Sequence, residues 1–303
     1  MSPIRIGTRG SALALAQAGL VGDALRAADG GDEVELVAIT TTGDRGAGGD
    51  KSRFVKEIDA AVLRGEVDLA VHSAKDVPGE LPDGLAILGV PPRADPRDAV
   101  CGAGSLDELA EGAAVGTSSL RRRAQLLARR PDLRIEELRG NVDTRLRRLA
   151  GGDFDALVLA AAGLDRLGRS SDGRPIGVDT VVPAGGQGAL VLQGRSADEE
   201  TAARCRAVSD DGSFTRLLAE RSLVRALDAS CRTPLGVHAR EDGTALRVDA
   251  FAGLPDGSWW IRDTVSGSPD DPEALGRALA DRMRAAGAGD LLREAEGGER
   301  SGQ

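Results

Sequence analysis

The chain has 303 residues, 41% hydrophobic and 29% charged, which is ordinary for a globular protein and long enough for two or three domains with cores of their own. The net charge of −9 and the 2% of aromatic residues argue against a nucleic-acid binder, which needs basic surfaces and stacking side chains. No stretch approaches the roughly 18 apolar residues of a membrane span, and the first residues lack the regions of a signal peptide. Three scattered cysteines, Cys101, Cys205 and Cys231, predict free thiols in a reducing compartment, hence the cytoplasm.

The first part of the chain predicts a β-turn-α-β-loop-α-β plan. An apolar strand begins at Ile4 and ends in a turn over residues 7–11. The periodicity then predicts a helix over about 12–28, a strand over 34–40, a helix over about 54–64 and a last strand near 67–71.

The same plan is repeated further along the chain. A strand over 113–116 leads into a Gly-Thr-Ser-Ser turn, and a helix over about 120–130 and a strand over 133–138 follow. A second turn at 139–141 opens a helix over 142–149, and a strand ends near Leu159. Because strands alternate with helices, we expect two similar α/β lobes with parallel sheets.

Two segments rich in proline and glycine, 90–98 and 182–188, predict two crossings between the lobes and a cleft that can open and close. The remainder predicts a small α+β domain, with a helix over 214–227, strands over 236–239, 245–251 and 258–265, a helix over 272–286 and a frayed tail over 296–303. The predicted domains are therefore a first α/β lobe (1–91 and 189–210), a second α/β lobe (92–188) and the C-terminal domain (211–303).

A short apolar run ends abruptly in the polar residues His72, Ser73, Lys75 and Asp76, and Pro78 prevents the strand from continuing. Ligands of open α/β sheets bind beyond the carboxyl ends of the strands, so this is a candidate site of chemistry. A surface ion pair of Lys75 with Asp76 fits the spacing equally well. His72 is as consistent with a structural role as with a catalytic one.

Both lobes place a Gly-Thr turn with further hydroxyls before a helix. Helix N-termini bind anions, although capping by a single hydroxyl is the commoner role, and two matched copies favour a ligand. Arginines beside these and similar turns indicate a ligand with several carboxylates, whereas solvated helix faces account for Arg129, Arg130, Arg147 and Arg148. The turn residues are Arg9, Ser11, Thr117, Ser118, Ser119, Arg121, Arg122, Arg123, Arg139, Arg145 and Arg166.

Cys231 lies in a loop next to Arg232, where a thiol can have a lowered pKa and be reactive. A buried structural cysteine is the alternative. The sequence contains no cysteine–histidine set with metal spacing, no Walker loop and no Gly-x-Ser-x-Gly turn, so it predicts no metal site.

Several long motifs occur in one order: Val-His-Ser-Ala-Lys-Asp-Val-Pro at 71–78, Gly-Thr-Ser-Ser-Leu-Arg-Arg at 116–122, Leu-Arg-Gly-Asn-Val at 138–142, Ala-Gly-Leu-Asp-Arg-Leu-Gly at 162–168, Pro-Ala-Gly-Gly-Gln-Gly-Ala at 183–189, and the Cys231 loop. In sequence and spacing they resemble the porphobilinogen deaminase family, also called hydroxymethylbilane synthase. The resemblance extends from Arg5 to Gly236. It implies two lobes like those of periplasmic binding proteins and a monomeric enzyme.

The resemblance also implies an activity and its cofactor. The family joins four porphobilinogen molecules head to tail with loss of ammonia and releases hydroxymethylbilane by hydrolysis, for tetrapyrrole biosynthesis. The chain grows on a dipyrromethane cofactor held by a thioether, and Cys231 aligns with the attachment cysteine.

By the same resemblance Asp76 is the catalytic residue, which accepts hydrogen bonds from pyrrole N–H groups and stabilises the cation formed as ammonia leaves. Lys75 binds a carboxylate of substrate or cofactor. The remaining binding residues that the resemblance implies are Arg9, Ser11, Ser73, Thr117, Ser118, Ser119, Arg121, Arg122, Arg139, Arg145, Arg166 and Gln187, with Asp44 and Lys51 as weaker matches in a covering loop.

The chain departs from the family pattern in three places. The loop at 43–53 is shorter than in many members and lacks a lysine near Ala47, Ala74 replaces a commoner methionine, and Gln193 stands where an acidic residue is frequent. The rival hypothesis is a non-catalytic two-lobed binding protein for a small polycarboxylate, which has no use for a covalent group on Cys231. Neither hypothesis calls for a nucleic-acid partner or a membrane.

Overall fold

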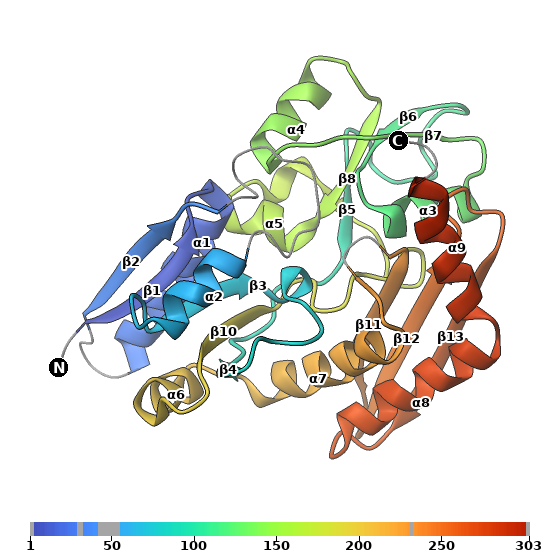
Figure 1. The fold of residues 1–303 in the computed structure, drawn as a ribbon. Helices are drawn as coiled ribbons and strands as arrows, with labels where there is room; N and C mark the ends of the chain where they lie inside the picture. Colours follow the sequence, from blue (N-terminus) through green and yellow to red (C-terminus); the bar gives the residue numbers. More distant parts are fainter. Residues whose placement is uncertain (1–2, 29–32, 42–54, 231–232, 301–303) are drawn as a thin grey trace. The chain divides into compact units, whose positions relative to one another are not determined.

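The computed structural model describes residues 3–28, 33–41, 55–230 and 233–300 (Figure 1). The chain divides into two compact units, one formed by residues 1–94 and 188–215 and the other by residues 95–187 and 216–303. It leaves the first unit and returns to it at points inside the two segments where the crossings are expected.

The first unit contains a five-stranded sheet in the order β2-β1-β3-β10-β4. Its strands are β1 (Ile4–Arg9), β2 (Val34–Ile39), β3 (Leu69–Ser73), β4 (Leu85–Gly89) and β10 (Leu190–Arg195), and its helices are α1 (Ala12–Ala28), α2 (Lys56–Leu63) and α6 (Glu199–Ala207). One apolar cluster fills the face toward α1 and α6, and a second fills the face toward α2.

The expectation of parallel sheets is wrong for part of each lobe. β1 pairs in parallel with β2 and β3, but β10 runs antiparallel to β3 and β4. The chain re-enters this sheet where β3 ends, since the N–H of Ala74 donates to the carbonyl of Ala189 at 3.0 Å and Leu190 lies opposite Ser73. A strand that starts at the carboxyl end of its neighbour runs in the opposite direction.

The second unit repeats the arrangement in the order β7-β6-β8-β5-β9, with β5 antiparallel to β8 and β9. The equivalent order confirms the two similar lobes. The elements are β5 (Asp98–Cys101), β6 (Ala114–Gly116), α3 (Leu120–Arg129), β7 (Arg134–Glu136), α4 (Val142–Ala150), β8 (Ala156–Ala160), α5 (Ala161–Arg166) and β9 (Arg174–Pro175). In both sheets the antiparallel strand is the first one after a crossing.

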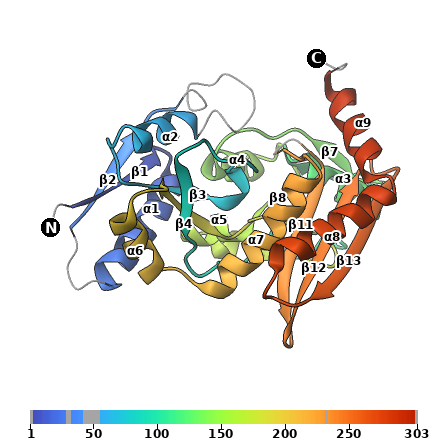
Figure 2. The same ribbon diagram turned by 60° about the horizontal axis from the view of Figure 1, so that its bottom comes forward.

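The last part of the chain forms an antiparallel sheet β11-β12-β13 (Figure 2). Its elements are α7 (Asp211–Ala226), β11 (Leu235–Asp242), β12 (Ala245–Gly253), β13 (Trp260–Gly267), α8 (Pro272–Ala285) and α9 (Ala288–Arg300). Of the predicted frayed tail, residues 296–300 are helical because α9 continues to Arg300, and residues 301–303 lie outside the described residues. Within the described ranges no helix has the length and apolar character needed to cross a membrane.

Candidate functional site

The first unit carries a hydroxyl-rich turn between β1 and α1. Ser11 caps α1, because its Oγ accepts the N–H of Ala14 at 3.3 Å, and the buried Thr8 donates its hydroxyl to the carbonyl of Ala14 at 3.2 Å. Arg9 ends β1 and is half-buried. Capping accounts for the serine here, and anion binding by Arg9 and Ser11 stays a prediction.

β3 delivers the central motif of this unit. Its five residues end at Ser73, a single 3₁₀ turn over Ala74–Asp76 follows, and the backbone is extended again at Val77. Ala74 is buried against the sheet, whereas Ser73, Lys75 and Asp76 are half-buried. The turn therefore places Lys75 and Asp76 in consecutive positions at the carboxyl end of a buried strand, where the sequence predicts them.

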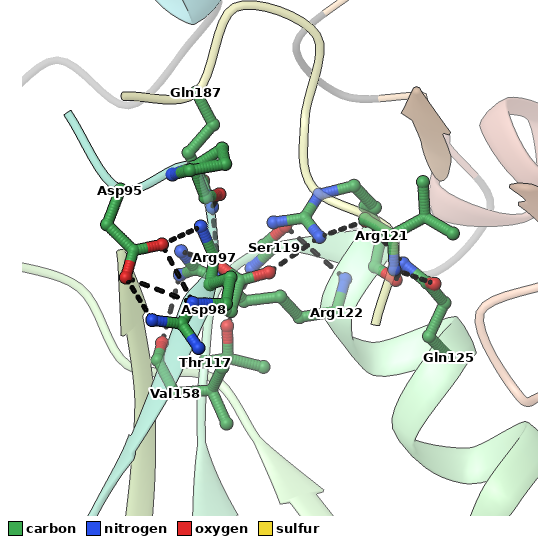
Figure 3. Close-up of polar contacts among 12 residues, drawn as sticks. Asp95, Arg97, Asp98, Thr117, Ser119, Arg121, Arg122, Gln125, Val158 and Gln187 are labelled. Carbon is green, nitrogen blue, oxygen red and sulfur yellow. Dashed lines mark hydrogen bonds and ion pairs between the residues drawn. The ribbon is translucent and has the colours of Figure 1, made fainter. Parts of the chain in front are cut away.

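In the second unit a buried carboxylate organises two of the predicted arginines (Figure 3). Asp98 at the start of β5 is fully buried, and its Oδ2 accepts from Arg121 at 2.7 Å. Its Oδ1 accepts from Nε and Nη2 of Arg122 at 2.9 and 2.7 Å and from the amide of Gln187 at 2.9 Å. Both arginines are themselves buried.

Electrostatics explains this cluster. Arg121 and Arg122 lie in the first turn of α3, where the positive end of the helix dipole repels their charges. A nearby anion is therefore required to stabilise them there. Burial would raise the pKa of Asp98, but the charges of Arg121 and Arg122 outweigh it and hold that pKa far below its usual range. Sequence reasoning missed Asp98, although the unfavourable placement of adjacent arginines at a helix start was a usable signal.

The cluster also fixes both crossing segments within the second unit. Gln187 donates to the carbonyl of Pro96 at 2.8 Å as well as to Asp98. Arg121 and the amide of Gln125 donate to the carbonyl of Val182 at 2.7 and 3.0 Å, and Gln125 accepts the N–H of Val182 at 2.7 Å. Residues near 96 and near 182–187 are therefore held together at α3.

Arg145 differs from these arginines because it lacks an anion. Its Nε donates to the carbonyl of Gly140 at 2.8 Å and its Nη2 to Ser118 at 3.4 Å, and no described carboxylate pairs with it. Desolvation and then the charge of Arg122 lower the pKa of Arg145 to about 10. A desolvated cation beside a hydroxyl is suited to bind a carboxylate.

The other predicted residues of this unit are polar residues at the starts of helices and two further arginines, Arg139 and Arg166. Ser119 and Asn141 cap α3 and α4, and the buried Thr117 accepts the N–H of Ser119 at 3.2 Å. Gly140 precedes that cap with φ of 112°, which glycine adopts readily. Arg139 is exposed and paired with Glu137 at 2.7 Å, while Arg166 at the end of α5 is half-buried and its pKa is lowered by desolvation.

Three predicted residues, Asp44, Lys51 and Cys231, lie outside the described residues. The two described residues that flank Cys231 and Arg232 in the sequence are hydrogen-bonded, because Thr233 accepts the N–H of Ser230 at 2.8 Å and donates to Glu296 of α9 at 2.6 Å. The other two thiols are fully buried, and burial raises the pKa of Cys101 to about 11 and that of Cys205 to about 12. Neither is suited to act as a nucleophile.

No set of three or more metal-ligating side chains occurs in the part of the chain that the structure describes. The fold and these residues define an α/β protein with cationic and hydroxyl side chains after the strands of two similar sheets. Residues 4–203 match the family model "porphobilinogen deaminase, dipyromethane cofactor binding domain", and residues 214–285 match the C-terminal domain of the same enzyme. The chain belongs to the porphobilinogen deaminase family.

Named relatives agree. A porphobilinogen deaminase of Brevibacillus brevis is 44% identical over 97% of this chain and 98% of its own length, and one of Thermus thermophilus is 46% identical over 96% and 99%. Among solved structures, the methionine binding protein MetQ shares 18% identity at a TM-score of 0.45, over 70% of this chain and 91% of its own.

Proposed function

We propose that this chain is the enzyme its family name describes, joining four porphobilinogen molecules head to tail with loss of ammonia and releasing hydroxymethylbilane by hydrolysis. Each substrate brings an acetate and a propionate, so a growing product accumulates negative charge. The observation that carries the proposal is Arg145, a partly desolvated cation that no described carboxylate neutralises. A bound carboxylate would supply the missing charge.

We propose that the covalent dipyrromethane is bound by side chains of the second unit, where Arg145 beside Ser118 is suited to bind one of its carboxylates. When bound, it supplies the pyrrole end to which the first substrate is joined. We assign its attachment to the thiol of Cys231, which is supported by the raised pKa values of the two buried thiols and by the anchored flanks Ser230 and Thr233.

Asp76 is assigned the chemical step. Its carboxylate accepts hydrogen bonds from pyrrole N–H groups and stabilises the positive charge that appears as ammonia departs. Its place in the turn after β3 supports this role, because Ala74 in that turn is buried and Asp76 is half-buried at the carboxyl end of the strand. Lys75 in the same turn binds a substrate or cofactor carboxylate.

The remaining residues divide between binding and positioning. Arg122 has its Nε and both terminal nitrogens bonded to Asp98 and to the carbonyl of Val158, so its ion pair fixes the start of α3, and any ligand must share these donors. We assign carboxylate binding to Arg9, Ser11, Ser73, Thr117, Ser118, Ser119, Arg121, Arg122, Arg139, Arg145 and Arg166, with Gln187 at the second crossing and with Asp44 and Lys51 in the loop at 43–53.

We further propose a monomer in the cytoplasm, with neither a nucleic-acid nor a membrane partner. The net charge of −9 and the free buried thiols Cys101 and Cys205 support this assignment.

Intact mass spectrometry tests the assignment directly. The purified protein should be heavier than its sequence by one dipyrromethane, and C231S should have the bare sequence mass and almost no activity. C101S is the matched control and should keep the adduct. A C231S protein that still holds a covalent pyrrole and turns over excludes the assignment, and a bare mass for the unaltered protein favours a non-catalytic binder of polycarboxylates.

A further inference from the structure

One face of the sheet β11-β12-β13 packs against α3, and both belong to the same compact unit. Ala250 and Ala252 of β12 lie in the apolar cluster that the sheet shares with α7, α8 and α9. Phe251 between them points to the opposite face, because side chains alternate along a strand. On that face Phe251 is buried and packs with the fully buried Ala124 of α3 and with Val182. The C-terminal domain therefore supports the middle of α3.

The turn between β12 and β13 approaches the end of α3 more closely. Residues 254–257, Leu-Pro-Asp-Gly, form a β-turn in which the N–H of Gly257 donates to the carbonyl of Leu254 at 2.9 Å. Gly257 has φ of 74°. A Cβ there would lie 2.4 Å from the backbone nitrogen of Ala128 and 2.6 Å from the carbonyl carbon of Leu127, distances that a Cβ does not tolerate. Because backbone atoms cannot rotate away as a side chain can, only glycine fits at this contact.

Other contacts hold the hairpin in place. The ring of Trp259 lies against Gly287 in the turn between α8 and α9, where a Cβ would be 3.6 Å from the indole. Arg262 of β13 donates to the carbonyls of Val178 and Asp179 at 3.3 and 2.5 Å. The hairpin is therefore attached to the second lobe and to the last two helices, so an added atom at its tip displaces α3 rather than the hairpin.

α3 transmits such a displacement to its other end. The helix has 10 residues, Leu120–Arg129, with no proline or glycine that could bend it, and is about 15 Å long. Its first turn carries Arg121 and Arg122, which Asp98 holds through hydrogen bonds of 2.7–2.9 Å. A shift of the helix therefore moves these two guanidinium groups or strains their hydrogen bonds.

We propose that Gly257 is a positioning residue for the carboxylate-binding residues at the start of α3. The hairpin of the C-terminal domain sets the place of the helix, and the missing side chain of Gly257 allows the close approach that this requires. The C-terminal domain thus takes part in carboxylate binding without contacting the ligand through this hairpin. The inference rests on the binding role proposed above for Ser119, Arg121 and Arg122.

Gly243 offers a matched control for a substitution of Gly257. It lies in the turn between β11 and β12 with φ of 62°, and a Cβ there would have no other heavy atom within 4 Å. G257A and G243A therefore introduce similar backbone strain, but only G257A meets α3. In ammonia-release kinetics G257A should raise the KM for porphobilinogen about tenfold, because displaced binding groups bind less well, whereas G243A should change it by less than about twofold.

A second control separates positioning from general stability. V248A removes buried methyl groups from the face of β12 that is turned away from α3, so it should lower the unfolding midpoint without changing the KM. If G257A does not fold, F251L replaces it, because this change reduces the contact with Ala124. F251L should raise the KM about threefold, and a KM equal to that of V248A would exclude the inference.

Hydrogen exchange tests the contact without substrate. The amides of residues 120–126 should exchange about tenfold faster in G257A than in G243A, because a displaced helix has weaker hydrogen bonds. The inference is wrong if G257A and G243A agree within about twofold in either the KM or the exchange rate. An unaltered protein that releases no ammonia would instead contradict the proposed function, and the exchange rates would still decide whether the hairpin positions α3.

Discussion

Replacing Asp98 by asparagine should destabilise the second unit severely. The substitution keeps the shape of the side chain but removes the only carboxylate that pairs with Arg121 and Arg122 among the described residues, and those arginines are 4% and 6% exposed. Removing one partner of a buried ion pair costs about 3–5 kcal/mol, and two stranded cations place this variant near the upper end, about 5 kcal/mol. The matched control is Asp95→Asn, three residues earlier, whose pair with Arg97 is partly exposed to solvent and should contribute only about 0–1 kcal/mol.

Urea unfolding followed by tryptophan fluorescence provides the assay. The only tryptophans, Trp259 and Trp260, belong to the second unit, so their emission reports on the unit that contains Asp98. A D98N/R122M double variant should recover part of the lost free energy of unfolding, since it removes one of the stranded cations. Equal unfolding free energies for D98N and D95N, within about 1 kcal/mol, would refute the electrostatic account of this cluster.

Three further predictions concern the sites of the two units. D76N, which loses the charge, should slow single-turnover ammonia release by about 10²–10³-fold or more, whereas D76E should keep slow turnover, and wild-type-like release from D76N would assign the step to another residue. R145M should weaken substrate binding by about 1.5–3 kcal/mol in calorimetry, whereas R147M, which changes an exposed arginine on the same helix, should leave it unchanged. If R145M and R147M bind substrate equally well, Arg145 does not bind a substrate carboxylate. In the folded protein the pKa of His72 is lowered to about 4, below its unfolded value of about 6.5. The free energy of unfolding should therefore fall by about 3 kcal/mol between pH 6.5 and pH 4 because of this residue. If the difference in unfolding free energy between the unaltered protein and H72Q does not change over this pH range, the prediction is wrong.

Local sequence pattern was enough to predict most elements. α1 and the start of α3 lie where apolar periodicity and capping hydroxyls place them, because both signals involve residues within one or two turns. The direction of β10 could not be predicted in this way. It depends on where the chain re-enters the sheet after a long excursion, which is a property of the tertiary path.

For the candidate site, too, the sequence predicted some features, and others depended on the tertiary structure. The sequence pointed to Lys75 and Asp76 after a buried strand, and the structure places both in a fixed turn there. It also listed Arg121, Arg122 and Arg145 together as candidate carboxylate-binding residues, and the structure gives them different partners. Asp98 pairs with the first two from more than twenty residues away along the chain, while Arg145 has only a carbonyl and a hydroxyl as partners.

The sequence by itself therefore determined the family and the repeated lobe, and it pointed to the candidate side chains of the site, since motifs, periodicity and spacing are written in consecutive residues. Only the tertiary structure decided which charges are already neutralised. A salt bridge depends on the distance between side chains and on their burial, and both are set by segments far apart in the chain. For that reason the ion pairs of Asp98 with Arg121 and Arg122 became visible only once the sheet of the second unit was assembled.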